Sequence, residues 1–86
     1  MTKRPSISHA DLLDLAQRWR AVRSWTGSAR LLTGIAVSRA GVDASYVGES
    51  GGEHYYRTAS GQFFSFDCVV DRCTLHVGEI PKNLNR

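Results

Sequence analysis

The chain has 86 residues, enough for one small domain and near the lower limit at which a single hydrophobic core suffices for stability. Of these residues 42% are hydrophobic and 22% are charged, and no apolar run approaches the length of a membrane span, so the composition excludes a disordered chain and a transmembrane helix. The basic first residues are not followed by the apolar segment of a secretory signal. We therefore expect a cytoplasmic protein with no membrane partner.

The net charge is +3, and nine of the eleven basic residues are arginine. Arginine binds phosphate and carboxylate through its planar guanidinium group, so this bias favours RNA or an acidic protein as a partner. A GC-rich genome gives the same bias without any binding function, and both interpretations stay open. Because the domain is small, a homodimer or partner interface is a further expectation.

A basic tail at residues 1–7, predicted to be flexible, leads to a helix predicted at residues 9–23. Ser8 is the expected N-cap, and Asp11 is the acidic residue of the first turn. Apolar residues recur at spacings of three and four and form one stripe, which we expect to pack on a sheet. The stripe consists of Leu12, Leu15, Ala16, Trp19 and Val22.

Basic residues gather near the carboxyl end of this helix and in the loops. The candidates for contact with nucleic acid are Arg18, Arg20, Arg23, Arg30 and Arg72. The alternative interpretation is a solvated helix face whose positive charge complements the helix dipole.

The middle of the chain is less regular. Residues 29–39 are predicted to form a short second helix and then a strand, because Ile35 and Val37 alternate with small or polar residues. A short strand at residues 44–47 and a flexible loop at residues 48–52 are predicted to follow.

Aromatic and β-branched residues then alternate with polar ones, as in a half-buried antiparallel meander. The predicted strands cover residues 54–58, 62–70 and 73–80. The fold prediction is α+β: an N-terminal helix, plus the possible short second helix, packs on an antiparallel sheet of four or five strands. Residues 8–81 form a single domain in this prediction, and residues 82–86 form a frayed tail.

The turns between the strands decide which residues face each other. The turn at residues 59–61 is predicted to hold Gly61 in the left-handed region. The next turn is predicted at residues 71–72, because that choice aligns only apolar pairs on one face. We expect this face to be core, made of Tyr56, Phe64, Phe66, Cys68, Val70, Cys73, Leu75 and Val77.

The opposite face of the predicted sheet carries most of the side chains capable of chemistry. In the predicted register His76 lies opposite Asp67, and Glu53 lies beside them on the neighbouring strand. The candidate catalytic residues are His76, Arg57, Tyr55 and Asp67. The alternative is that Asp67 and His76 are an ordinary cross-strand pair on a solvated surface.

Cys68, Cys73 and His76 are close in sequence, but their spacing matches no common zinc ligand pattern. The predicted register also puts the histidine on the opposite face from both thiols. We expect no metal site, no cofactor and two buried, reduced thiols.

Cleavage of an RNA phosphodiester needs a base, an acid and a cation, and it requires no metal ion. His76 or His54 is suited to proton transfer, and Arg57 is suited to charge stabilisation. Tyr55 is suited to stacking on a nucleobase or donating a proton. Asp67 beside His76 would fix the tautomer of the imidazole.

A helical part followed by an antiparallel meander, with the local strings HYYRT, GQFF and TLH, resembles the small RNase toxins of the barnase, colicin and RelE-like superfamily. The resemblance covers about the carboxyl-terminal half of the chain. It implies metal-independent RNA cleavage, with Tyr55, Arg57 and His76 matching the general type of catalytic residue.

A second function class fits the same residues. A non-catalytic interaction module, such as a phage- or mobile-element-encoded inhibitor of a host protein, would bind through exposed aromatic residues, here Phe63 and Tyr55. The expected partner is therefore either RNA or a host or antitoxin protein.

Overall fold

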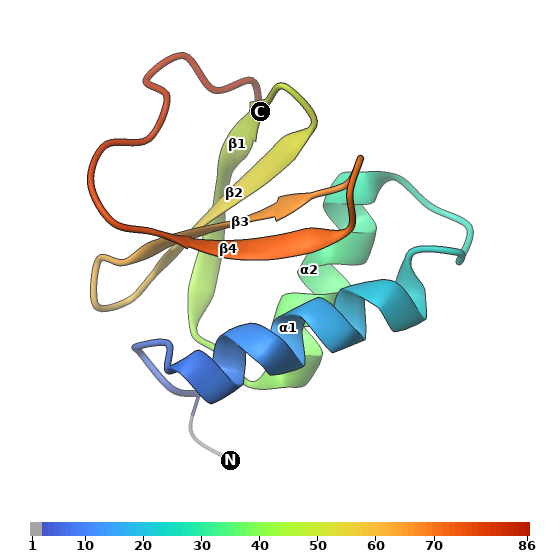
Figure 1. The fold of residues 1–86 in the computed structure, drawn as a ribbon, viewed down its shortest axis with the longest axis horizontal. Coiled ribbons are helices and arrows are strands. Elements are labelled where there is room, and N and C mark those ends of the chain that lie inside the picture. The colour runs from blue at the N-terminus through green and yellow to red at the C-terminus, as the bar shows by residue number, and fades with distance from the viewer. Residues whose placement is uncertain (1–2) are drawn as a thin grey trace.

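The computed structural model describes residues 3–86, which form two helices followed by a four-stranded antiparallel sheet with the strand order β1-β2-β3-β4 (Figure 1). The elements are α1 (His9–Val22), α2 (Ala29–Ala40), β1 (Ala44–Ser50), β2 (Glu53–Thr58), β3 (Phe63–Asp67) and β4 (Arg72–His76). The α+β class and the antiparallel sheet predicted from the sequence are confirmed.

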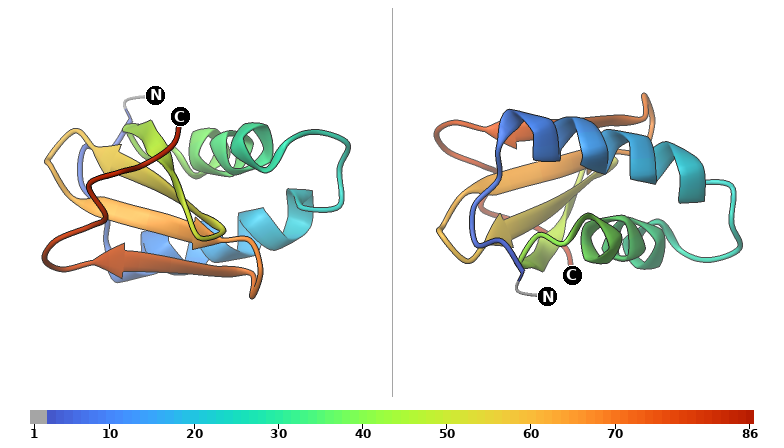
Figure 2. Two further views of the ribbon diagram at one scale, coloured as in Figure 1. Left: turned by 90° about the horizontal axis from the view of Figure 1, so that it is seen from above. Right: turned by 90° about the horizontal axis from the view of Figure 1, so that it is seen from below.

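The molecule has a helical layer on one side of the sheet. Figure 2 shows both helices on one face of the sheet and the C-terminal segment crossing the other face. Among the contacts between helices and strands, α1 lies against β4 and α2 against β2. The face turned away from the helices is therefore available for side chains that do not belong to the core.

The start of α1 is fixed by a capping box. The backbone N–H of Asp11 donates to the Ser8 hydroxyl at 3.2 Å, and the Asp11 carboxylate accepts from the backbone N–H of Ser8 at 2.9 Å. Arg4 makes an ion pair with the same carboxylate. The predicted roles of Ser8 and Asp11 are confirmed, and the helix ends one residue before the predicted end.

The second helix is longer than predicted. α2 continues to Ala40, so the strand predicted for the second half of residues 29–39 is wrong. The buried residues recur at helical spacings of one, three and four and face the core: Leu32, Thr33, Ala36, Val37 and Ala40. The alternation of Ile35 and Val37 was too short to separate a two-residue period from a helical one. Gly41, with φ 73°, ends the helix in the left-handed conformation.

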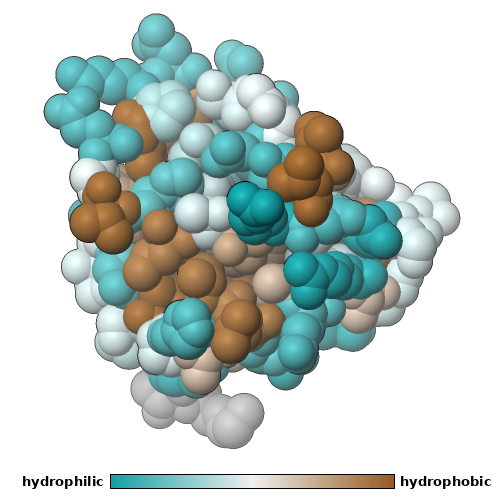
Figure 3. Space-filling view, viewed as in Figure 1, coloured by the Kyte–Doolittle hydropathy of each residue, from teal (hydrophilic) through white to brown (hydrophobic). Residues whose placement is uncertain are grey.

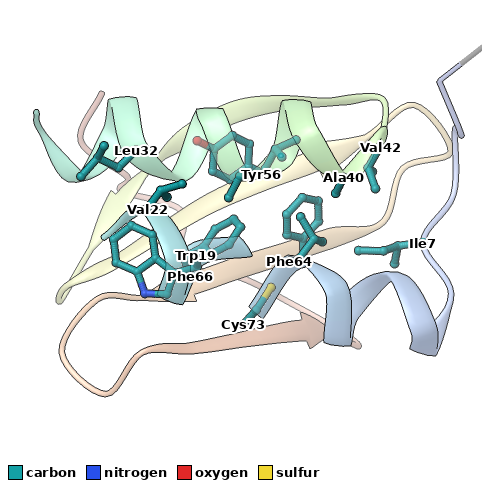
Figure 4. Close-up of a cluster of buried hydrophobic side chains, with 13 residues drawn as sticks. Ile7, Trp19, Val22, Leu32, Ala40, Val42, Tyr56, Phe64, Phe66 and Cys73 are labelled. Carbon is teal, nitrogen blue, oxygen red and sulfur yellow. The ribbon is translucent and has the colours of Figure 1, made fainter. Parts of the chain in front are cut away.

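The core lies between the helices and the sheet (Figure 4). Its aromatic part joins Trp19 of α1 to the sheet: the rings of Trp19 and Phe66 are 6.1 Å apart, and those of Phe64 and Phe66 are 6.0 Å apart. Phe64 and Phe66 are fully buried. Burial of each such side chain stabilises the fold by about 1.5–3 kcal/mol.

The turn between β2 and β3 is as predicted. Gly61 has φ 93°, and the backbone N–H of Thr58 donates to the carbonyl of Gln62 at 2.8 Å. This turn aligns Tyr56 with Phe64 and Arg57 with Phe63, as the sequence predicted.

The turn between β3 and β4 is different. β3 ends at Asp67, whose carboxylate accepts hydrogen bonds from the backbone N–H groups of Val69 and Val70 at 3.0 and 3.3 Å. Residues 68–71 therefore form a four-residue loop, and the predicted two-residue turn at 71–72 is wrong. The longer loop leaves Val70 56% exposed, so its assignment to the core is wrong.

The longer loop changes which residues of β4 pair with which residues of β3. Asp67 pairs with Arg72, and His76 pairs with Phe63, where the sequence had predicted Asp67 opposite His76. The change is an even number of residues, so each side chain of β4 keeps its predicted face. Val77 falls beyond the end of the strand and is 96% exposed, so its core assignment is wrong as well.

Both ends of the described chain are attached to the domain. Residues 1–2 of the predicted flexible tail lie outside the described residues, and Arg4 exchanges backbone hydrogen bonds with Gly41 and Asp43. The tail predicted to fray at residues 82–86 lies beside β1, where Asn85 and Glu49 exchange two backbone hydrogen bonds of 2.7 and 3.0 Å.

The double role of Asp11 gives a stability prediction. Asp11→Ala removes the capping carboxylate and the partner of Arg4 at a position that is 4% exposed. We expect the free energy of unfolding to fall by about 1–2 kcal/mol in urea titrations. Asp14→Ala is the matched control on the same helix, because it removes only a surface pair with Arg18 and is expected to cost about 0.5 kcal/mol or less. Equal losses of unfolding free energy in the two variants would contradict the capping role of Asp11.

Candidate functional site

The sheet face turned away from the helices, which we call the free face, carries three rows of side chains. Side chains that point to one face on paired strands lie about 5 Å apart. From β2 to β4 the rows are Glu53–Asp67–Arg72, Tyr55–Ser65–Thr74 and Arg57–Phe63–His76. The four-residue loop thus brings His76 into the row of Arg57 and Phe63.

His76 makes a close contact with the middle row. Its Nε2 is 2.6 Å from the Ser65 hydroxyl, and this hydroxyl donates to a carboxylate oxygen of Glu53 at 2.9 Å. The same oxygen of Glu53 is 3.8 Å from Nε2 of His76. The three side chains form one hydrogen-bonded group over the middle of the free face.

Tyr55 lies against this group. Its ring centroid is 5.2 Å from that of His76, with an interplanar angle of 38°. Burial raises the pKa of Tyr55, and the neighbouring Glu53 and Asp67 carboxylates raise it further. Tyr55 is only 5% exposed, so it supports the imidazole from the side and offers little surface to a partner.

Asp67 is not the partner of His76. Its carboxylate holds the loop after β3, and its cross-strand neighbour is Arg72. The prediction that Asp67 lies beside His76 was therefore wrong, and Glu53 acts on the histidine through Ser65. The set of candidate catalytic residues omitted Glu53 and Ser65, although their odd-numbered positions on β2 and β3 put them on the predicted free face.

Ser65 is not arranged as a nucleophile. In a Ser-His-acid triad the acid contacts the second ring nitrogen of the histidine, whereas Glu53 accepts directly from the Ser65 hydroxyl. Ser65 is also only 1% exposed. The group is suited to proton transfer at His76 and unsuited to attack by the serine oxygen.

The arginines predicted to contact nucleic acid, taken together with Arg57 of the candidate catalytic residues, divide into two sets. Arg57 and Arg72 are exposed on strands of the free face. The other four belong to the helical layer, and three of these have partners within the chain: Arg18 pairs with Asp14, Arg23 pairs with Asp71 and Arg30 lies over the ring of Tyr46 at 4.6 Å. Most of the helical arginines are therefore engaged within the chain, and their elements lie on the opposite side of the sheet from the free face.

A second polar cluster lies on the helix side of the sheet. His54 is 7% exposed, its Nδ1 is 3.1 Å from the Tyr46 hydroxyl, and its Nε2 is 3.6 Å from the Glu49 carboxylate. An open groove of about 500 Å³ runs between α2 and β1 next to this cluster, and its lining includes Leu31, Tyr46 and Tyr56. Since His54 and His76 lie on opposite faces, His54 is not an acid or base for the same site.

Both cysteines are free thiols. Burial raises the pKa of Cys73 to about 12 and that of the half-buried Cys68 in the same direction, so neither is a thiolate near neutral pH. Within residues 3–86, no three His, Cys, Asp or Glu side chains are grouped as a metal site would require. Neither helix in this part of the chain is both long and apolar enough to span a membrane.

The chain matches no protein family model, no curated protein and no solved structure.

The burial of His54 gives a prediction about pH. Burial lowers the pKa of His54, and the Glu49 carboxylate opposes this shift. The folded state therefore disfavours protonation, whereas the unfolded chain protonates below about pH 6.5. The stability that His54 contributes as a neutral residue is present above about pH 6.5 and is lost as the pH falls through the lowered pKa of the folded state.

We expect His54→Gln to reduce the loss of unfolding free energy between about pH 7 and about pH 5, measured by urea titration. The substitution His9→Gln at an exposed position is the control and should leave the pH dependence unchanged. An identical pH dependence in His54→Gln and the wild type would contradict the assignment.

Proposed function

We propose that the free face binds RNA and that the protein is a metal-independent endoribonuclease of the small toxin type. The observation that carries this proposal is the row Arg57–Phe63–His76, which groups an exposed cation with a half-buried aromatic ring and a half-buried proton-transfer residue on the free face. The histidine and the cation serve cleavage of the phosphodiester, and the aromatic ring serves binding of a base of single-stranded RNA.

Each residue of the row has one role. His76 takes the proton of a ribose 2′-hydroxyl, and the 2′ oxygen attacks the adjacent phosphorus. The bond from phosphorus to the 5′ oxygen breaks, and this oxygen takes a proton from water. The products are a 2′,3′-cyclic phosphate and a 5′-hydroxyl end. Arg57 stabilises the negative charge that develops on the phosphate oxygens, and the ring of Phe63 stacks on a base.

The charge distribution supports a polyanionic substrate. The net charge of +3 favours the approach of RNA, and Arg57 and Arg72 are exposed at opposite ends of the free face. The resemblance of HYYRT and TLH to the strands of small RNase toxins points to the same residues, since these strings contain Tyr55, Arg57 and His76.

A non-catalytic protein-interaction module is the second candidate, and the groove between α2 and β1 favours it. Leu31, in the lining of this groove, is 56% exposed. Apolar atoms are also visible where α1 runs below β4 (Figure 3). Phe63 is half-buried, so the aromatic surface of the free face is smaller than the sequence predicted.

The nuclease proposal predicts the behaviour of matched histidine variants. Purified wild-type protein is expected to cleave single-stranded RNA in the presence of EDTA, because no metal ion takes part. His76→Ala is expected to lower the cleavage rate by about a hundredfold or more, and Arg57→Ala by a similar factor. His9→Ala, at an exposed helix start, should leave the rate unchanged. The cleavage rate of all four proteins is measured with a fluorescently labelled RNA.

Cells that express the protein supply the second measurement. Fragmented total RNA after induction of the wild type, with intact RNA after induction of His76→Ala, agrees with the proposal. Intact RNA in both, with soluble protein, overturns it and favours the interaction module. In that case Phe63→Ala or Leu31→Ala should release a co-purified protein, and His76→Ala should not.

A further inference from the structure

The hydroxyl of Ser65 fixes the direction of two hydrogen bonds. A serine hydroxyl has one proton to donate, and a carboxylate only accepts. The Ser65 hydroxyl donates to Glu53 at 2.9 Å, so its proton is not available to His76. Its oxygen lies 2.6 Å from Nε2 of His76, and a contact this short is a hydrogen bond only if Nε2 carries a proton. The chain of donation therefore runs from His76 through Ser65 to Glu53.

This direction decides the tautomer of the neutral imidazole. With its proton on Nε2, His76 has a lone pair on Nδ1. None of the hydrogen bonds found among residues 3–86 uses Nδ1 of His76. The ring is held from the side by Tyr55 at 5.2 Å, and its side chain remains 23% exposed. Nδ1 is thus the nitrogen with a free lone pair, in the row that also carries Arg57.

We propose that Ser65 and Glu53 are positioning residues that hold His76 in the Nε2–H tautomer and leave Nδ1 as the base for an RNA 2′-hydroxyl. This inference rests on the proposed ribonuclease function. In the proposed step Nδ1 takes the proton of the 2′-hydroxyl, and Nε2 keeps its own proton throughout. Neither Ser65 nor Glu53 touches the reacting atoms.

The two supporting residues have different effects on the tautomer. Without the Ser65 hydroxyl, Nε2 loses its close acceptor, and the Glu53 carboxylate at 3.8 Å is too far away to replace it as a hydrogen-bond acceptor. Without the Glu53 carboxylate, the Ser65 proton is free to turn toward Nε2, which favours the opposite tautomer with its proton on Nδ1. Loss of either residue therefore leaves His76 in the wrong tautomer for part of the time.

The test is nitrogen NMR of full-length protein labelled with ¹⁵N-histidine, at a pH at least about two units above the ordinary histidine pKa of ~6.5. In the wild type, Nε2 of His76 is expected to resonate as a protonated nitrogen and Nδ1 as an unprotonated one. His9 is exposed and serves as the internal reference for a free mixture of tautomers. A wild-type His76 with its proton on Nδ1, or one averaged like His9, overturns the inference.

Three variants complete the test. Ser65→Ala and Glu53→Ala are expected to move both ring nitrogens of His76 toward averaged or inverted values, and Ser65→Thr, which keeps the hydroxyl, is expected to restore the wild-type pattern. Glu53 is a half-exposed residue, so Glu53→Ala keeps the test decisive if a substitution at the buried Ser65 prevents folding. Unchanged tautomer signals in a folded Glu53→Ala protein overturn the inference.

RNA cleavage by the same variants separates this inference from the proposed function. We expect Ser65→Ala and Glu53→Ala to lower the rate about tenfold or more and Ser65→Thr to recover it. If the wild type cleaves RNA while its His76 carries the proton on Nδ1, this result overturns the positioning role alone. The Nε2–H tautomer without any cleavage overturns the proposed function and, with it, the role of Nδ1 as a base.

Discussion

The hydrogen bonds from Val69 and Val70 to the Asp67 carboxylate determine which side chains lie side by side on the free face. They end β3 and turn the chain into a four-residue loop, and this loop length sets the pairing of β4. The far side of the loop is held by Asp71, which accepts from the Trp19 indole at 3.1 Å and pairs with Arg23. Contacts with α1 thus help to fix the strand pairing that places His76 beside Phe63 and in the row of Arg57.

The two faces of the sheet have different chemistry because they meet different neighbours. The helix side buries Phe64, Phe66 and Tyr56 against α1 and α2, and this burial supplies the main driving force for folding. On the free face Arg57, Arg72 and Thr74 are exposed to water, whereas the polar side chains that are buried or half-buried must satisfy one another. Glu53, Ser65 and His76 do so, and no buried side-chain nitrogen or oxygen within residues 3–86 lacks a partner. The same requirement holds the imidazole of His76 beside Ser65 and Glu53.

The parts of this structure that follow from local rules could be predicted from the sequence. The capping box of Ser8 and Asp11, the left-handed Gly61 and the alternation of the strands need only neighbouring residues. The loop after β3 could not be predicted, because two-residue and four-residue turns give the same face to every side chain of β4. The choice depends on the bonds of Asp67 and on the contacts of Asp71 with α1. For the same reason the sequence placed His76 on the free face but opposite Asp67, whereas the structure places it opposite Phe63 and in contact with Ser65.

The most direct test of the central claim, that the free face is the surface that meets RNA, is an NMR titration of ¹⁵N-labelled His76→Ala protein with a short single-stranded RNA. The substitution keeps the RNA intact during the measurement. The account predicts that the largest amide shifts occur at Arg57, Phe63 and their neighbours on β2, β3 and β4. Shifts confined to α1 and the groove beside α2, or no shifts at all, would contradict it.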